Sequence, residues 1–246
     1  MALFIISDLH LSENHPELLE AFSVFVGNLN KNDRLLIAGD LFDFFVGIDK
    51  EDSAQRQVRD TLKKAKERGI KSYFITGNRD FLIGKKHAHY FYMELLPDFY
   101  LIQTVKGPFL VTHGDMLCTN DKSYMRFKKW CQKPWLQALF KALPLSWRKK
   151  IGSNIRSKSM ENKRHKGAGH KIYDVIPQAV DKYINLKPGI IGIIHGHTHI
   201  FGKKIERPSN ALRISLGAWG SNYSYIRSDT QGLAVVEKSL DSLFGN

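Results

Sequence analysis

The sequence is poor in cysteine and has no long apolar run. Its two cysteines, Cys118 and Cys131, show neither the paired spacing of a zinc knuckle nor the pattern of a small disulfide-stabilised scaffold, so both are expected to be reduced and structural. No apolar run approaches the roughly 18 residues that a membrane span needs. The opening segment MALFIISDLH has no basic leader, which indicates a cytoplasmic protein without a membrane span.

Acidic residues are almost absent from one part of the chain. Between Lys122 and Lys171, 15 Lys and Arg face a single acidic residue, Glu161, whereas the rest of the chain has 22 basic and 23 acidic residues. The net charge of +13 therefore comes from one segment. Such a basic segment can bind nucleic acid, an anionic membrane surface or a phosphorylated substrate, or it can be a merely solvated helical surface.

The pattern along the chain is typical of an α/β protein. With 246 residues, 43% of them hydrophobic, the chain can form one large domain or a domain with an insertion. Apolar runs at 2–7, 34–39 and 71–76 predict strands, and helical periodicity predicts helices at 16–29 and 53–68, the second with Ser53 as its N-cap.

The second half repeats this alternation around a long helical segment. A hairpin is predicted over 98–115, helices over most of 123–183, a strand at the approach to 195, and short strands after it. The basic segment lies mainly in the helical stretch, where Leu136, Leu139, Phe140 and Leu143 follow the spacing of an apolar helix face.

Polar residues follow five of the predicted strands. They are Asp8 and His10, Asp40, the run Gly77-Asn78-Arg79-Asp80, His113, and the run Gly196-His197-Thr198-His199. Open α/β sheets bind ligands at the carboxyl ends of their strands, so these groups can converge. Carboxylate, amide and imidazole donors together suit Mn, Fe or Zn better than calcium. Taken alone, histidines at a strand end could hydrogen-bond neighbouring loops instead.

The five motifs together resemble the dinuclear calcineurin-like metallophosphoesterases, whose pattern is D-x-H, G-D, G-N-H-[DE], a lone His and G-H-x-H. The resemblance implies that Asp40 bridges two metal ions. One ion would also take Asp8, His10 and His199, and the other Asn78, His113 and His197. His195 matches no ligand position and is expected to pack or hydrogen-bond nearby.

The sequence departs from the superfamily pattern at Arg79, where many members carry a His that is thought to protonate an alkoxide leaving group. Arginine cannot act as that acid near neutral pH, but it can clamp phosphate oxygens and stabilise their charge. A phosphate monoester leaving group needs little protonation, so Arg79 favours a diphosphate substrate.

The G-N-R-D form is also that of the UDP-2,3-diacylglucosamine hydrolases of lipid A synthesis, and the chain resembles that family from Phe4 to about Trp219. The matching segments are FIISDLHL, GDLFDFFVG, GNRDFLIGK, HGDMLCTND, PWLQALFKALPL, HGHTH and LGAW. The resemblance implies a four-layer α/β/β/α sandwich with mixed sheets, forming one domain over 1–246 with a helical lid insertion at approximately 120–168. It also implies two Mn ions and water attack on the α-phosphorus of UDP-2,3-diacylglucosamine, which gives UMP and 2,3-diacylglucosamine 1-phosphate (lipid X).

The same resemblance implies roles for individual residues. Arg79, Asp40 and His197 would be catalytic. The substrate contacts would be Asn78, Arg79, Asp121, Ser159, Lys163, Lys166 and His197. The family often has Asn where this chain has Lys163, so either Lys163 replaces that residue or Asn162 takes its place. Two acyl chains would lie in the lid, against some of Phe127, Trp130, Trp135, Leu136, Leu139, Phe140 and Leu143, whose other members would pack in the core.

The partners expected on this basis are the acylated UDP-sugar and the cytoplasmic face of the inner membrane, contacted peripherally by a monomer that binds no nucleic acid. An alternative is a metallophosphodiesterase acting on nucleotides or nucleic acid, which the basic segment favours. A catalytically inactive scaffold is a third hypothesis, but such proteins are expected to have lost metal ligands, and here every ligand position is filled.

Overall fold

The computed structural model describes residues 1–166, 174–186, 188–206 and 209–245, with the backbone alone at 156 and 158–166. Its strands are β1 (Leu3–Ile6), β2 (Arg34–Ala38), β3 (Lys71–Ile75), β4 (Met93–Leu95), β5 (Tyr100–Thr104), β6 (Gly107–Val111), β7 (Gly192–His195), β8 (Gly202–Ile205), β9 (Leu212–Ser215), β10 (Asn222–Asp229) and β11 (Gly232–Ser239). Its α-helices are α1 (Pro16–Gly27), α2 (Ser53–Glu67), α3 (Lys85–Tyr90), α4 (Lys122–Cys131), α5 (Pro134–Ala142), α6 (Leu145–Lys166) and α7 (Pro177–Ile184). Short 3₁₀ helices are η1 (Asp115–Leu117) and η3 (Leu240–Leu243).

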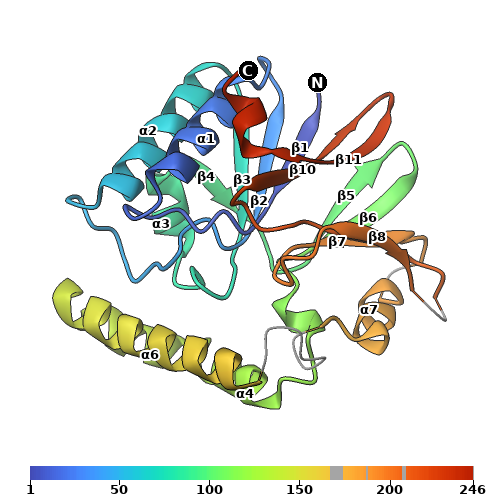
Figure 1. Cartoon of the computed structure of the whole chain (residues 1–246). Coiled ribbons are helices and arrows are strands. Elements are labelled where there is room, and N and C mark those ends of the chain that lie inside the picture. Colours follow the sequence, from blue (N-terminus) through green and yellow to red (C-terminus); the bar gives the residue numbers. More distant parts are fainter. Residues whose placement is uncertain (167–173, 187, 207–208, 246) are drawn as a thin grey trace.

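Two mixed sheets face each other (Figure 1). The six-stranded sheet has the order β11-β10-β1-β2-β3-β4, in which β1 to β4 are parallel and the other two pairings are antiparallel. The five-stranded sheet has the order β5-β6-β7-β9-β8, with β6, β7 and β9 parallel. In each sheet, the parallel strands place their carboxyl ends at one edge.

Alternation along the strands builds the layers. On β2, Leu35 and Ile37 join the apolar core beneath α1, α2 and α3, whereas Leu36 joins a second core between the sheets, because successive side chains point to opposite faces. A third core packs α7 against the five-stranded sheet through residues such as Val180 and Ile193. The predicted four-layer α/β/β/α sandwich is confirmed.

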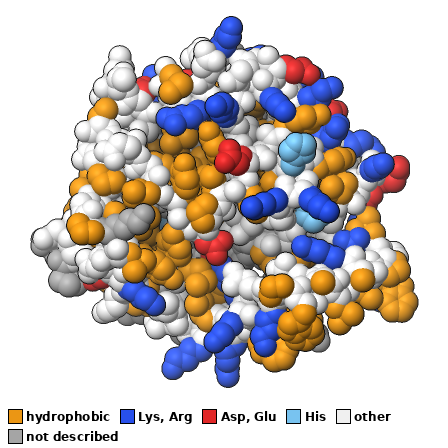
Figure 2. Space-filling model, turned by 180° about the vertical axis from the view of Figure 1, so that it is seen from behind, with side chains coloured by type: hydrophobic (Ala, Val, Ile, Leu, Met, Phe, Trp, Pro, Cys, Tyr) orange, Lys and Arg blue, Asp and Glu red, His pale blue; other side chains and the backbone are white. Residues whose placement is uncertain are grey.

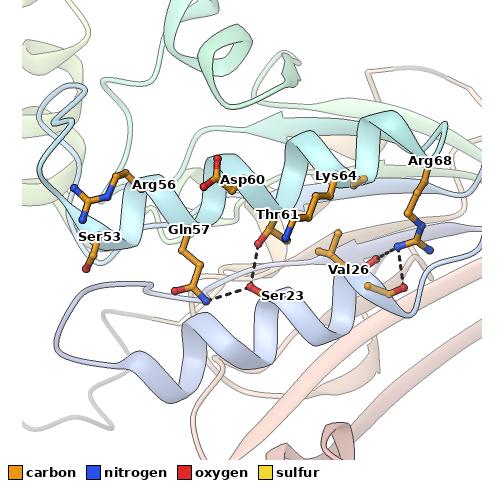
Figure 3. A pocket seen from close by; sticks show the side chains of 11 residues that line it. Ser23, Val26, Ser53, Arg56, Gln57, Asp60, Thr61, Lys64 and Arg68 are labelled. Atoms are coloured by element: carbon orange, nitrogen blue, oxygen red, sulfur yellow. Dashed lines mark hydrogen bonds between the residues drawn. The ribbon is translucent and has the colours of Figure 1, made fainter.

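The first two helices lie side by side over the six-stranded sheet (Figure 3). Ser23 of α1 lies 2.9 Å from the Thr61 hydroxyl of α2, and Arg68 donates a 2.8 Å hydrogen bond to the Gly27 carbonyl at the end of α1. The prediction that Ser53 caps α2 was wrong. Asp52 is the N-cap, since its carboxylate accepts from the Gln55 N–H at 3.0 Å.

Helices α4 and α6 of the insertion run along the lower edge of the molecule (Figure 1). Arg148 of α6 donates a 2.6 Å hydrogen bond to the Val46 carbonyl, and Gly152 packs directly on the Phe44 ring, where an added Cβ would lie 2.0 Å from a ring carbon. These two contacts fix the first half of α6 to the loop after β2.

The insertion also exposes large apolar side chains. More than a third of the surface of each is exposed at Phe127, Trp130, Trp135, Leu139, Trp147, Ile151 and Ile155. Figure 2 shows apolar and basic side chains next to one another along this lower edge. Phe140 instead packs against the core beneath α1 to α3. Within the described residues, no helix is both long and apolar enough to cross a membrane.

Candidate metal centre

The seven predicted ligands converge at the carboxyl ends of five strands. Asp8 and His10 follow β1, Asp40 follows β2, Asn78 follows β3, His113 follows β6, and His197 and His199 follow β7. Backbone hydrogen bonds join these loops: the Asp8 N–H donates to the Gly39 carbonyl at 3.1 Å, and the Gly196 N–H donates to the His113 carbonyl at 2.8 Å. The second bond connects the ends of β6 and β7, so the relative positions of the loops are set by the sheets.

One group of side chains gathers around Asp8. The Nε2 atoms of His10 and His199 are 3.2 Å apart, and His199 Nε2 lies 3.4 Å from Asp8 Oδ1. One ligand atom from each of the three residues lies within 4.8 Å of the other two. These are the three residues that the family resemblance assigned to one of the two metal ions.

A second group gathers around Asn78. Its Oδ1 lies 3.0 Å from His113 Nε2 and 2.7 Å from His197 Nδ1. Asp40 lies between the two groups, with Oδ1 3.6 Å from His113 Nε2 and Oδ2 3.9 Å from His10 Nδ1. This is the place that a carboxylate bridging two ions would occupy.

The donor set fits divalent cations. His10 Nδ1 is buried and has no hydrogen-bond partner among the described residues, and Asp8 and Asp40 are almost completely buried. Burial and the charge of Asp8 raise the pKa of Asp40. Burial would also raise the pKa of Asp8, but a hydrogen bond from His199 and the charge of His113 hold this pKa well below its usual range. Cations would supply positive charge to both carboxylates.

The backbone at the centre is strained. Asp8, His10, Asp40, His197 and His199 all have positive φ, between 51° and 66°, which non-glycine residues adopt uncommonly. Tight packing leaves no room for larger neighbours: a Cβ at Gly77 would lie 2.1 Å from Asp40 Oδ1, and one at Gly196 would lie 2.0 Å from Asp8 Oδ2. The surrounding loops thus hold these five residues in an unfavourable backbone conformation, which points their side chains into the centre.

Asp80 supports the centre without pointing at it, a role that the sequence analysis missed. Its buried carboxylate accepts from the N–H groups of Gly77 at 2.8 Å and Leu41 at 2.7 Å, and so joins the loops after β2 and β3. Burial and the charge of Asp40 raise the pKa of Asp80 to about 7. The only feature of the sequence that indicated a role for Asp80 was its place as the last residue of the G-N-R-D motif.

Arg79 points its guanidinium along the edge of the centre. Its Nη1 lies 2.5 Å from Asp43 Oδ1, its Nε lies 3.5 Å from Asp40 Oδ2, and its backbone N–H donates to Asp40 Oδ1 at 2.9 Å. The side chain remains 27% exposed, so it can meet a ligand as well as its acidic neighbours. Asp43, which orients it, was also not predicted.

A buried cluster connects the centre to the insertion. Asp115, two residues after His113, accepts hydrogen bonds from the Tyr124 hydroxyl and, at 2.6 Å, from the Lys128 ammonium. Tyr124 and Lys128 lie one turn apart on α4, and the Tyr124 ring centroid is 6.3 Å from that of His197. Neither residue carried a signal that separated it from the other basic and aromatic residues of the segment.

We expect Asp115→Ala to lower the free energy of unfolding by about 3 to 5 kcal/mol, because Lys128 would stay buried without its counter-charge. The double variant Asp115→Leu/Lys128→Met should lose less. Burial alone would raise the pKa of Asp115, but Lys128 lowers it from 3.8 to about 2. The stabilisation is therefore complete above pH 3.8 and is lost as the pH falls towards 2. Urea unfolding at pH 7 and pH 3 tests both statements, and a loss below about 1 kcal/mol at pH 7 would contradict the first.

The other predicted residues are placed as follows. Asp121 is the N-cap of α4, where its carboxylate accepts from the Tyr124 N–H at 2.9 Å. Ser159, Lys163 and Lys166 fall in α6, but their side chains lie outside the described part of the chain. His195 is buried, as expected, with Nδ1 2.7 Å from the Gly196 carbonyl, and burial lowers its pKa to about 4.

Comparison with known families agrees with this geometry. The calcineurin-like phosphoesterase family matches residues 1–201. The chain belongs to the calcineurin-like phosphoesterase family. Membership of this metallophosphoesterase family implies divalent metal binding and makes the chain a hydrolase. The donor groups just described accord with that chemistry.

Calcineurin-like phosphoesterases similar to the chain over nearly its whole length come from several bacteria. A protein named UDP-2,3-diacylglucosamine hydrolase from Haemophilus influenzae (strain PittGG) is 42% identical over 231 residues, which are 93% of this chain and 95% of that protein. Proteins of the same name from Histophilus somni (strain 2336) and Tolumonas auensis are 39% and 37% identical, over 95% and 98% of this chain and 98% and 99% of theirs. Because so much of the chain is covered, the similarity includes the insertion as well as the metal motifs.

Proposed function

We propose that this protein hydrolyses the diphosphate of UDP-2,3-diacylglucosamine in lipid A biosynthesis. Water would attack the α-phosphorus, and the products would be UMP and 2,3-diacylglucosamine 1-phosphate (lipid X). The observation that carries the proposal is the 37–42% identity to proteins named for this hydrolysis, over 93% or more of the chain. The metal centre would serve hydrolysis of the diphosphate, and the apolar and basic side chains of the insertion would serve binding of the acylated sugar.

The metal centre of the proposed enzyme would hold two Mn ions. Asp8, His10 and His199 would bind one ion, Asn78, His113 and His197 would bind the other, and Asp40 would bridge them. When bound, two such cations acidify an attacking water and offset charge on the attacked phosphate. The 2.7 and 3.0 Å contacts around Asn78 Oδ1 and the 3.2 Å contact between His10 and His199 support this division.

The chain's own residues would position the diphosphate. Arg79 has a guanidinium beside the centre, and it would donate two parallel hydrogen bonds to phosphate oxygens and stabilise their developing charge. The same phosphates would also be contacted by Asn78 and His197, which belong to the second group of ligands. Because a guanidinium cannot serve as a general acid near neutral pH, the leaving phosphate would depart without one, which suits a leaving group of low pKa.

The remaining substrate would lie against the insertion. In this proposal the chain is one domain with a lid at approximately 120–168, and two acyl chains contact its exposed apolar residues, Trp130 and Leu139 among them. Asp121 would contact the glucosamine, and Ser159, Lys163 (or Asn162) and Lys166 would contact the substrate from the lid side. The basic side chains would also hold the protein, as a monomer, on the anionic cytoplasmic face of the inner membrane, without binding nucleic acid.

Product analysis in oxygen-18 water tests this function. The purified protein, given UDP-2,3-diacylglucosamine and Mn, is expected to form UMP and lipid X with the label in UMP, and a chelator should stop the reaction. Label in lipid X would move the attack to the other phosphorus. Cleavage of simple phosphodiesters, nucleotides or nucleic acid without cleavage of the acylated substrate would replace this function with the nucleotide-directed alternative.

A further inference from the structure

A pocket of about 820 Å³ opens beside the metal centre. His10 and Arg79 line its inner end, and Trp219, Asn222, Asp241 and Phe244 are among the residues that line the rest. No described side chain of the insertion is in its wall, since the other lining residues are Asp43 after β2 and residues from the start of α1 and from the segments that flank β10 and β11. The pocket therefore extends the phosphate end of the site in a direction that the described side chains of the insertion do not occupy.

The outer wall of the pocket is preformed. The Leu240 N–H donates to the Ser221 carbonyl at 2.8 Å, and the Gly220 N–H donates to the Asn222 carbonyl at 2.9 Å, so the loop before β10 is tied to η3. Trp219 is only 4% exposed and packs edge-on against Phe25, with ring centroids 5.5 Å apart. The wall needs little ordering when a ligand enters.

The exposed groups of this wall match one kind of ligand. The side chains of Ser221, Asn222 and Asp241 are exposed where they line the pocket, and Phe244 is 42% exposed. An amide offers a donor and an acceptor, which are the complement of the imide edge of uracil, and a carboxylate or hydroxyl can accept from ribose hydroxyls. An exposed aromatic ring offers a stacking surface for a base.

We propose that this pocket binds the uridine of the substrate. The inference rests on the proposed function. Asn222 would read the edge of the base, Phe244 would stack on it, and Asp241 would accept from the ribose, while Arg79 holds the adjoining phosphate. The sugar and its acyl chains then leave the centre towards α4, whose Tyr124 ring lies beside His197 at the other group of ligands. A volume of about 820 Å³ is within the usual range for small-molecule sites.

The test compares two substrates in the Mn-loaded full chain. For Asn222→Ala and Phe244→Ala, kcat/KM for UDP-2,3-diacylglucosamine should fall roughly 10-fold or more relative to kcat/KM for bis(4-nitrophenyl) phosphate, a diester without a nucleoside. Inhibition by UMP should weaken by a similar factor, and inhibition by inorganic phosphate should change less. Asn28→Ala, an exposed amide at the end of α1, is the matched control.

Two results would overturn the uridine site. One is an unchanged substrate ratio with unchanged UMP inhibition in both variants. The other is an equal fall with both substrates, which would mean that the wall acts only through the fold. If the parent protein cleaves the diester but not the acylated UDP-sugar, the proposed function fails instead. UMP binding to the parent and to the variants, measured by calorimetry, then still decides whether the pocket takes a nucleotide.

Discussion

Asp40→Ala is expected to lower kcat by at least about 10³-fold while the protein stays folded. In the proposed centre this carboxylate is shared by both cations, so its removal withdraws several kcal/mol of charge stabilisation from the transition state. His113→Ala should also lower kcat, because in the proposed centre it would be a ligand of the ion that Asn78 and His197 would bind. Metal content, measured after gel filtration, should fall in both variants.

The stability of the metal-free protein distinguishes loss of a ligand from loss of the fold. Burial raises the pKa of Asp40 above 3.8, so the ionised carboxylate destabilises the metal-free fold increasingly as the pH rises beyond that value. Asp40→Ala removes this destabilisation but also loses the hydrogen bond from the Arg79 N–H. The two effects oppose each other, and the free energy of unfolding at pH 7 should stay within about 1 kcal/mol of the parent value.

Surface variants supply the controls for both substitutions. Asp60→Ala removes an exposed carboxylate from α2, and His89→Ala removes an exposed imidazole from α3. Both should retain parental kcat, metal content and metal-induced stabilisation. Near-parental turnover by Asp40→Ala or His113→Ala would remove the centre with two metal ions from the mechanism.

The convergence of the candidate ligands was predictable, because each of them follows the carboxyl end of a predicted strand. Asp8, Asp40 and Asn78 each come just after a buried parallel strand, and the sheet order places those ends together whatever the connecting segments do. The strand pattern also predicted an α/β body with a mixed sheet, because continuous apolar strands must be covered on both faces. The four-layer arrangement was an expectation from the family resemblance. Family resemblance then added the division of the ligands between two ions, which the residue pattern alone left open.

Features that depend on tertiary contacts were not predictable. Ser53 was predicted as the N-cap of α2, but Asp52 occupies that position. Serine and aspartate are both good capping residues, and only the local backbone decides between them. The burial of Lys128 could not be read from a segment with 15 basic residues, because its partner Asp115 lies in another motif. The uridine pocket is assembled from His10, Arg79 and residues near the C-terminus, which no local pattern connects.

The basic segment acquires a different interpretation once it is placed in the fold. One of its lysines, Lys128, forms a buried ion pair with Asp115. Two other basic residues, Arg148 and Lys149, bind α6 to the loop after β2. The exposed apolar side chains lie among the other basic residues of the same helices. A polynucleotide requires a continuous basic surface, whereas an acylated phosphate requires both kinds of side chain together, so this arrangement favours the lipid substrate.

Arg79→Ala is expected to lower kcat for the diphosphate on the order of 10² to 10³-fold, with metal content close to the parent value. The reason is that a preorganised donor acting on charge that develops in the transition state contributes this much. Arg79→Lys keeps the positive charge but loses the planar pair of donors, so it should recover only part of the rate. Loss of metal with an unchanged kcat per bound ion would contradict the role.

A third variant at the same position separates charge stabilisation from acid catalysis. Arg79→His would restore the residue that the superfamily pattern has there, and an imidazolium can protonate an alkoxide whereas a guanidinium cannot. Relative to Arg79→Ala, it should therefore raise the rate on an alkyl phosphate monoester more than the rate on the diphosphate. Asp43 lies 2.5 Å from the Arg79 side chain and would favour the protonated imidazole if it keeps that contact. Equal gains on both substrates would mean that residue 79 acts through its charge alone, and the preference for a diphosphate would then have to come from the pockets on either side of the centre.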